Sequence, residues 1–187
     1  NEYSELTKAS RMVTINAENA YKTAGLSANE YMETVTSFSA SLIQSLGGDT
    51  VKAAEYADRA IVDMADNANK MGTSIQMIQN AYQGFAKQNY TMLDNLKLGY
   101  GGTQAEMYRL MKDAEKLGAK FNSEFSLDSK GTLQADFADI TTAIHVIQEN
   151  MGIAGVYLTS KENYISYDEY KEIHKNEKVV DGGVSYT

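Results

Sequence analysis

Two residues four positions apart are the first candidates for site chemistry in this sequence. His145 and Glu149 would share one face of a helix, at the spacing by which helical metal sites place two ligands. The only other histidine, His174, falls in a tail of different composition. We therefore predict no metal site, and we interpret His145 as a partly buried imidazole that is hydrogen bonded to a carbonyl group or to water.

A glycine-rich segment at residues 99–103 has the second arrangement that suggests chemistry. Its glycines precede a predicted helix start, as they do in loops that cradle phosphate groups. The segment lacks the Lys followed by Ser or Thr that neutralises the phosphates in such loops. We therefore predict a linker that ends in a helix cap, and we expect no cofactor.

Three aspartates, Asp58, Asp63 and Asp66, resemble part of a calcium-binding loop. The residues between them follow a helical pattern, however, and the glycine that such a loop needs for its turn is absent. The sequence therefore predicts that these carboxylates lie on the solvated face of a helix.

The composition narrows the function further. The 187 residues include no Cys and two His, so catalysis would depend on carboxylate pairs, and we expect no enzyme. With 17 Lys and Arg against 25 Asp and Glu, the formal net charge is −8, which argues against nucleic-acid readout. No stretch approaches the roughly 18 apolar residues of a membrane span. The chain begins at Asn1 rather than Met, and we expect it to be a segment of a longer protein.

The elements that must position these residues are predicted to be helices. The chain has no Pro, and apolar residues recur at spacings of three and four between glycines. Possible capping boxes begin at Ser27, Thr73 and Thr103. We expect an all-α fold of six short amphipathic helices, in hairpins or in an elongated bundle. The expected helices cover residues 3–24, 27–46, 49–71, 73–85, 103–117 and 137–151, with a loop at 118–132.

One apolar stripe, which runs from Ala54 to Phe85, is long enough for one helix to associate with another. It resembles a heptad seam and continues into the following helix. Packing between copies in a homo-oligomer and closure of a monomeric core are both open interpretations. The candidate association residues are Ala54, Ile61, Met64, Ala68, Met71, Ile78, Tyr82 and Phe85.

The composition changes near the C-terminus. We predict a helical region at residues 1–155 and a small mixed appendage at residues 156–187. Five of the 13 tyrosines fall in the appendage. A Tyr side chain combines apolar area with a hydroxyl group, which suits recognition of a protein or a cell-wall polymer.

Two long segments resemble the core of tail tape measure proteins from long-tailed phages and prophages of Gram-positive bacteria. They are YADRAIVDMADNANKMGT at residues 56–73 and IQNAYQGFAKQNYTMLDNLKLGYGG at residues 78–102. Residues 25–48 and 143–152 resemble the same family in the same order, so the resemblance covers roughly residues 25–155.

The resemblance implies a virion structural protein, helix-rich and present in several copies. Such a protein fills the lumen of the tail tube, sets tail length, and contacts tail-tip, tail-tube and tail assembly chaperone proteins. It is made in the bacterial host cytoplasm and is then found in the virion. A tape measure is several times longer than this chain, so the length-setting repeats are expected outside it.

The chain departs from the family pattern after Gly155, where further helix rich in Ala and Thr is usual. The alternative interpretation follows from this difference. In it, a phage-derived helical domain serves as a binding module, and the Tyr-rich residues 156–187 capture its partner.

Overall fold

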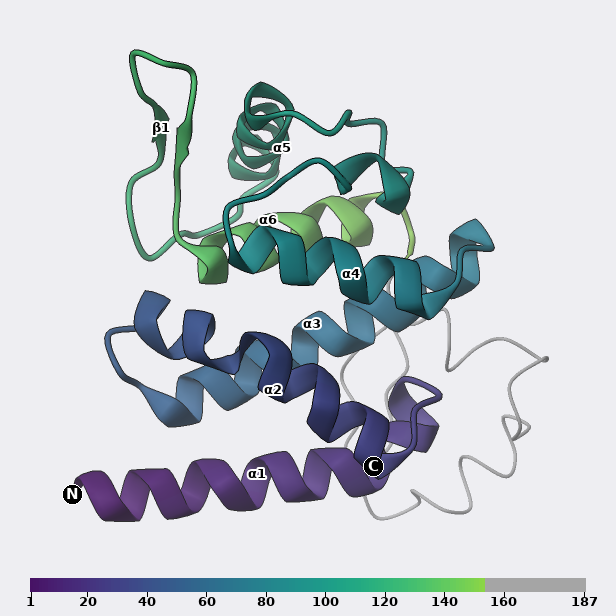
Figure 1. Cartoon of the computed structure of the whole chain (residues 1–187), viewed down its shortest axis with the longest axis vertical. Coiled ribbons are helices and arrows are strands. Elements are labelled where there is room, and N and C mark those ends of the chain that lie inside the picture. Colours follow the sequence, from purple (N-terminus) through teal and green to yellow (C-terminus); the bar gives the residue numbers. More distant parts are fainter. Residues whose placement is uncertain (154–187) are drawn as a thin grey trace.

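The computed structural model describes residues 1–153, and these form six α-helices, one short 3-10 helix and a two-stranded sheet (Figure 1). The predicted all-α fold is therefore confirmed. The predicted appendage at residues 156–187 lies outside the described residues. The elements in chain order are α1 (Glu2–Thr23), α2 (Ala28–Ser45), α3 (Thr50–Met71), α4 (Ile75–Ala86), η1 (Leu93–Leu96), α5 (Gln104–Lys116), β1 (Ser126–Leu127), β2 (Leu133–Gln134) and α6 (Phe137–Asn150).

Five of the six α-helices begin where a side chain caps the first turn. Ser27 Oγ accepts a hydrogen bond from the Glu30 amide at 3.1 Å, and Thr103 Oγ1 accepts one from the Glu106 amide at 3.1 Å. The cap predicted at Thr73 is displaced by one residue, because Ser74 Oγ accepts from the amide of Met77 at 3.3 Å. Local hydrogen bonding thus fixes these helix starts, whereas the side chain of Asp136 makes no capping bond at the start of α6.

Helix α3 lies at the centre of the described chain. It contacts α1, α2, α4, α6 and η1 (Figure 1), and ten of its 22 residues are buried. Helices α1 and α3 pack on each other, and both carry buried alanines, whose small side chains allow helix axes to approach closely. The buried alanines include Ala9, Ala17 and Ala20 on α1 and Ala53, Ala54, Ala57 and Ala60 on α3. Helix α3 is therefore the central helix of the described core.

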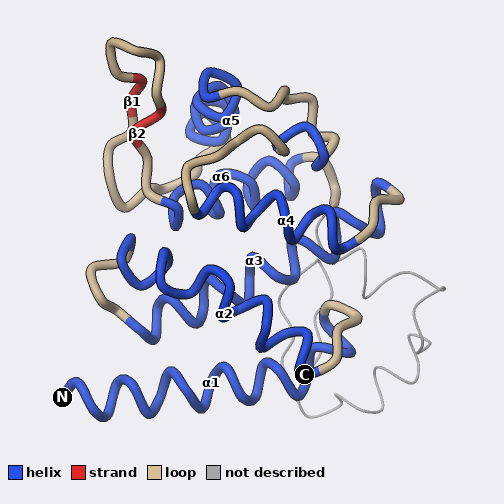
Figure 2. Tube along the Cα trace, in the orientation of Figure 1, coloured by secondary structure: helices blue, strands red, loops and turns tan. Residues whose placement is uncertain are grey.

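The expected loop at 118–132 contains structure that the sequence did not predict. Strands β1 and β2 pair antiparallel, with Leu127 opposite Leu133. They form the small sheet drawn in red at one end of the molecule (Figure 2). Each strand has two residues, too few to show an alternating pattern, and Asp128 Oδ1 closes the turn by accepting from the amides of Lys130 and Thr132.

Two buried tyrosines give a paired prediction about stability. Tyr31 and Tyr90 are each 1% exposed, but the Tyr31 hydroxyl donates to Asp58 Oδ1 at 2.7 Å, whereas the Tyr90 hydroxyl has no partner within residues 1–153. We expect Tyr31→Phe to lower the free energy of unfolding by about 1.5–3 kcal/mol, because it removes a bond to a charged group. Tyr90→Phe should leave stability unchanged or raise it.

Urea unfolding of the full chain, followed by circular dichroism, measures both variants against the parent. An equal loss for the two substitutions would contradict the prediction, since only one of the two hydroxyls has a partner to lose.

Candidate functional site

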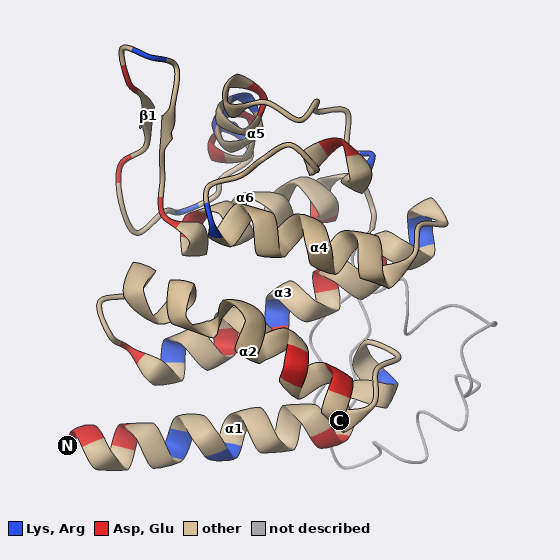
Figure 3. Cartoon of the chain, in the orientation of Figure 1, with Lys and Arg blue, Asp and Glu red and all other residues tan. Residues whose placement is uncertain are grey.

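Three polar side-chain pairs cross the interface between α3 and α6, and we call them the polar ladder. On α3 the residues are spaced by four and on α6 by three, and the numbers rise together, so the two helices run in the same general direction here. The ladder consists of Arg59 with Thr142, Asp63 with His145, and Asn67 with Gln148. Figure 3 shows acidic and basic positions on α3, in the middle of the molecule.

The middle rung holds an imidazole between two carboxylates. His145 Nδ1 lies 3.0 Å from each carboxylate oxygen of Asp63, and His145 Nε2 lies 2.8 Å from Glu149 Oε1. The side chains of Asp63 and His145 are 4% and 16% exposed. A neutral imidazole has one N–H, so only the doubly protonated ring donates to both carboxylates.

The pKa of His145 agrees with this geometry. Burial has the largest influence and by itself lowers the pKa. The hydrogen bond and charge of Asp63, with the charge of Glu149, outweigh burial and the nearby Arg59 cation. The pKa of His145 is therefore raised above its ordinary value of 6.5.

The rung nearest the C-terminal end of α3 is neutral and fully buried. The Asn67 side-chain amide donates to Gln148 Oε1 at 2.8 Å and to the backbone carbonyl of Leu96 at 2.9 Å. The Gln148 amide donates in turn to the carbonyl of Asp63 at 3.1 Å. These bonds tie α3, α6 and η1 together, and removal of any one partner would leave a buried polar group unsatisfied.

The remaining rung is built around Arg59. Its Nη2 donates to Thr142 Oγ1 at 2.7 Å, and its guanidinium lies 4.8 Å from the centre of the Tyr56 ring. Tyr82 from α4 is fully buried, and its hydroxyl has no hydrogen-bond partner within the described part of the chain. Burial, then the charge of Asp63, raises the pKa of Tyr82 despite the opposing effect of Arg59.

This arrangement is suited to holding helices together. Both nitrogens of His145 already face carboxylates, so neither is free to act as a general base in this conformation. Within residues 1–153, no group of three or more His, Asp or Glu side chains is arranged to hold a metal ion.

The structure corrects two interpretations of the sequence. His145 is bonded to carboxylates and not to a carbonyl group or water. Asp63 and Asp66, predicted on a solvated face, are 3% and 2% exposed, while Asp58 is half-buried and accepts from Tyr31. The physical cause is tertiary packing: His145 of α6 contacts Asp63 and Tyr31 of α2 contacts Asp58, whereas an isolated amphipathic helix would leave these carboxylates to water.

Most of the candidate association residues lie inside the chain. Seven of the eight belong to the hydrophobic core of the same molecule or pack against it, and Ala54 is also buried. Ala54, Ile61, Met64, Ile78, Tyr82 and Phe85 are at most 5% exposed, whereas Ala68 and Met71 are half-buried at the edge of the core. Association between copies through this stripe stays a prediction.

The glycine-rich segment is held by helix α5. The amide of Gly101 donates to Glu106 Oε1 at 3.1 Å, and Arg109 Nη2 donates to the carbonyl of Gly99 at 2.8 Å. The pKa of Glu106 is lowered to about 2, first by the bond from Arg109 and then by the bond from Gly101. An amide that a phosphate would need is therefore occupied by a carboxylate of the chain itself.

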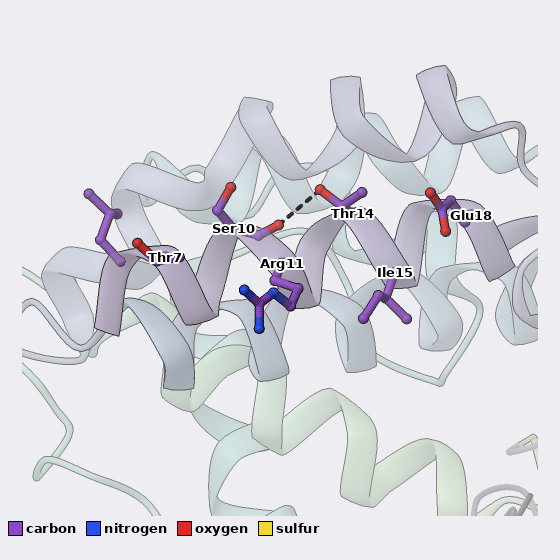
Figure 4. Close-up of a pocket in the computed structure, with 7 residues that line it drawn as sticks. Thr7, Ser10, Arg11, Thr14, Ile15 and Glu18 are labelled. Carbon is purple, nitrogen blue, oxygen red and sulfur yellow. Dashed lines mark hydrogen bonds between the residues drawn. The ribbon is translucent and has the colours of Figure 1, made fainter. Parts of the chain in front are cut away.

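A shallow groove on the outer face of α1 was not predicted. All seven residues that line it come from this one helix, and Arg11, Ile15 and Glu18 extend from its surface (Figure 4). None of these side chains is buried, and Ile15 is 50% exposed. The groove has the features of an ordinary solvated helix face.

Sequence reasoning missed Arg59, Asn67, Thr142 and Gln148 as members of a cluster. The available pattern was on α6, where Thr142, His145 and Gln148 recur every third residue with only apolar residues between them. None of the described helices is both long and apolar enough to cross a membrane.

Together these features define an all-α protein in which the polar ladder joins α3 to α6. Comparison of the chain with protein-family models, with curated proteins and with solved structures finds no match.

Proposed function

We propose that this chain is a structural module of a phage or prophage tail tape measure protein, and that it acts through assembly. The observation that carries the proposal is the resemblance of residues 56–73 and 78–102 to the core of that family. These segments supply most of α3, α4 and η1, and residues 143–152 supply most of α6. The resemblance therefore falls on the buried centre of the fold, including most of the polar ladder.

The shape of the described chain favours a docking module over a measuring rod. The longest helices have 22 residues and span about 33 Å, and they fold back on one another. A continuous helix of 153 residues would span about 230 Å. In this proposal the module engages tail-tip, tail-tube or assembly-chaperone proteins, first in the host cytoplasm and then in the tail lumen, and multiple copies act together in one tail.

An in-frame deletion of residues 1–153 in the encoding phage or prophage genome tests the proposal. We expect particles without tails, because a lost docking module prevents assembly from starting. A segment that only measured length would instead give tails shortened by up to about 230 Å. Electron microscopy of induced lysates distinguishes these results, and restoring the deleted codons is the control.

Two outcomes would contradict the proposal. Tails of normal length after the deletion would show that assembly does not need the module. Absence of tail-tube, tail-tip and chaperone genes from the surrounding genome would remove the proposed partners.

A further inference from the structure

We propose that the polar ladder is a proton-dependent lock, in which protonated His145 fastens α6 to α3 and loss of that proton loosens α6. In the middle rung, both ring nitrogens of His145 lie within 3.0 Å of carboxylate oxygens. Deprotonation turns one N–H donor into a lone pair that faces a carboxylate, so one favourable contact becomes a repulsive one.

Charged groups act on His145 from α3 and from its own helix, α6. Asp63 and Arg59 face it from α3, and Glu149 faces it from the next turn of α6. Tyr82 approaches Asp63 from α4 and stays neutral, since its pKa is raised. Two carboxylates therefore stabilise the cationic ring, and one guanidinium, which also donates to Thr142, destabilises it. The net electrostatic effect favours the cationic ring.

Loss of the cation affects more than one contact. Asp63 also accepts through its backbone carbonyl from Gln148, the next rung of the ladder. Helix α6 packs on α2, α4 and α5 as well as on α3. A weaker middle rung therefore loosens a helix that packs on four others, α2, α3, α4 and α5.

The sign of the pH dependence follows from the raised pKa of His145. The stabilisation is fully present below the unfolded-state value near 6.5, and it is lost as the pH rises through the higher folded-state value. For each unit by which the folded-state pKa exceeds the unfolded-state pKa, the folding equilibrium constant falls tenfold as the pH rises from the lower value to the higher one. We expect the full chain to be more stable at pH 6 than at pH 9.

The test uses urea unfolding of the full chain from pH 6 to pH 9. The chain has two histidines, so His174→Gln is a matched control for His145→Gln. We expect the parent and His174→Gln to lose stability with rising pH, whereas His145→Gln should show a flat profile over this range. Equal pH dependence in parent and His145→Gln, or its loss in His174→Gln, would overturn the proposal.

A second measurement does not depend on how well His145→Gln folds. Nitrogen-15 NMR of the folded parent should show both His145 ring nitrogens protonated at the acidic end of the titration, with a midpoint above the ordinary value of 6.5. Glu149→Gln, at a side chain that is 52% exposed, should lower the titration midpoint of His145. Glu115→Gln, at an equally exposed carboxylate on α5, should leave it unchanged. A His145 midpoint at or below 6.5 in the folded parent would refute the lock.

Discussion

Gly102→Ala is expected to lower the free energy of unfolding by more than about 3 kcal/mol. A Cβ atom at Gly102 would overlap the backbone carbonyl group of Thr91. Neither the segment of Thr91 nor the segment of Gly102 is free to move apart. Tyr90 and Leu93, close to Thr91 in the chain, are buried, and Arg109 holds the segment of Gly102 through a hydrogen bond to the carbonyl of Gly99. Urea unfolding at constant pH measures the loss.

The neighbouring glycine supplies the control. A Cβ atom at Gly101 would meet only the Glu106 side chain, at 3.8 Å, which is an ordinary contact. Neither Gly101 nor Gly102 has a positive φ, so backbone strain does not separate the two substitutions. We expect Gly101→Ala to change stability by less than about 1 kcal/mol. Similar losses at both positions would show that the close approach to Thr91 does not control stability.

The helical part of the fold was predictable because its determinants are local. A cap such as Ser27 or Thr103 bonds an amide three residues ahead, and apolar residues at spacings of three and four define a helix face within a few turns. Where the local rule has two solutions, the prediction was less accurate. Thr73 and Ser74 are both competent caps, and the structure uses Ser74.

The candidate site was only half predictable, because its partners are distant in sequence. His145 and Glu149 are four residues apart and were identified as a pair. Asp63 is 82 residues from His145, and Asn67 is 81 residues from Gln148. No single-helix pattern indicates which face of α3 another helix will cover, so a buried aspartate was assigned to solvent.

At Glu106, tertiary contacts also limit what a local sequence motif can predict. The capping-box pattern at Thr103 correctly predicts the bond to the Glu106 amide, but in that pattern the Glu106 carboxylate also returns to the Thr103 amide. In the structure this carboxylate bonds Gly101 and Arg109. A tertiary arrangement of the linker therefore replaces half of a local motif.

Ile61→Ala is expected to lower the free energy of unfolding by about 2–5 kcal/mol, the range for large-to-small substitutions in a packed core. Ile61 is fully buried at the centre of α3. Met71, in the same predicted stripe, is half-buried at the end of that helix, so Met71→Ala should cost less than half as much. Urea unfolding of the full chain measures both losses.

Protein concentration separates the core role of the stripe from a role in association. If Ile61 stabilises the fold within one chain, the unfolding midpoint of the parent and the loss caused by Ile61→Ala should be the same at low and high protein concentration. If the stripe instead pairs copies, the parent midpoint should rise with concentration, and Ile61→Ala and Met71→Ala should both reduce that rise. The burial of Ile61 favours the first result, because a side chain enclosed by its own chain has no surface to offer a second copy unless α3 first separates from its neighbours.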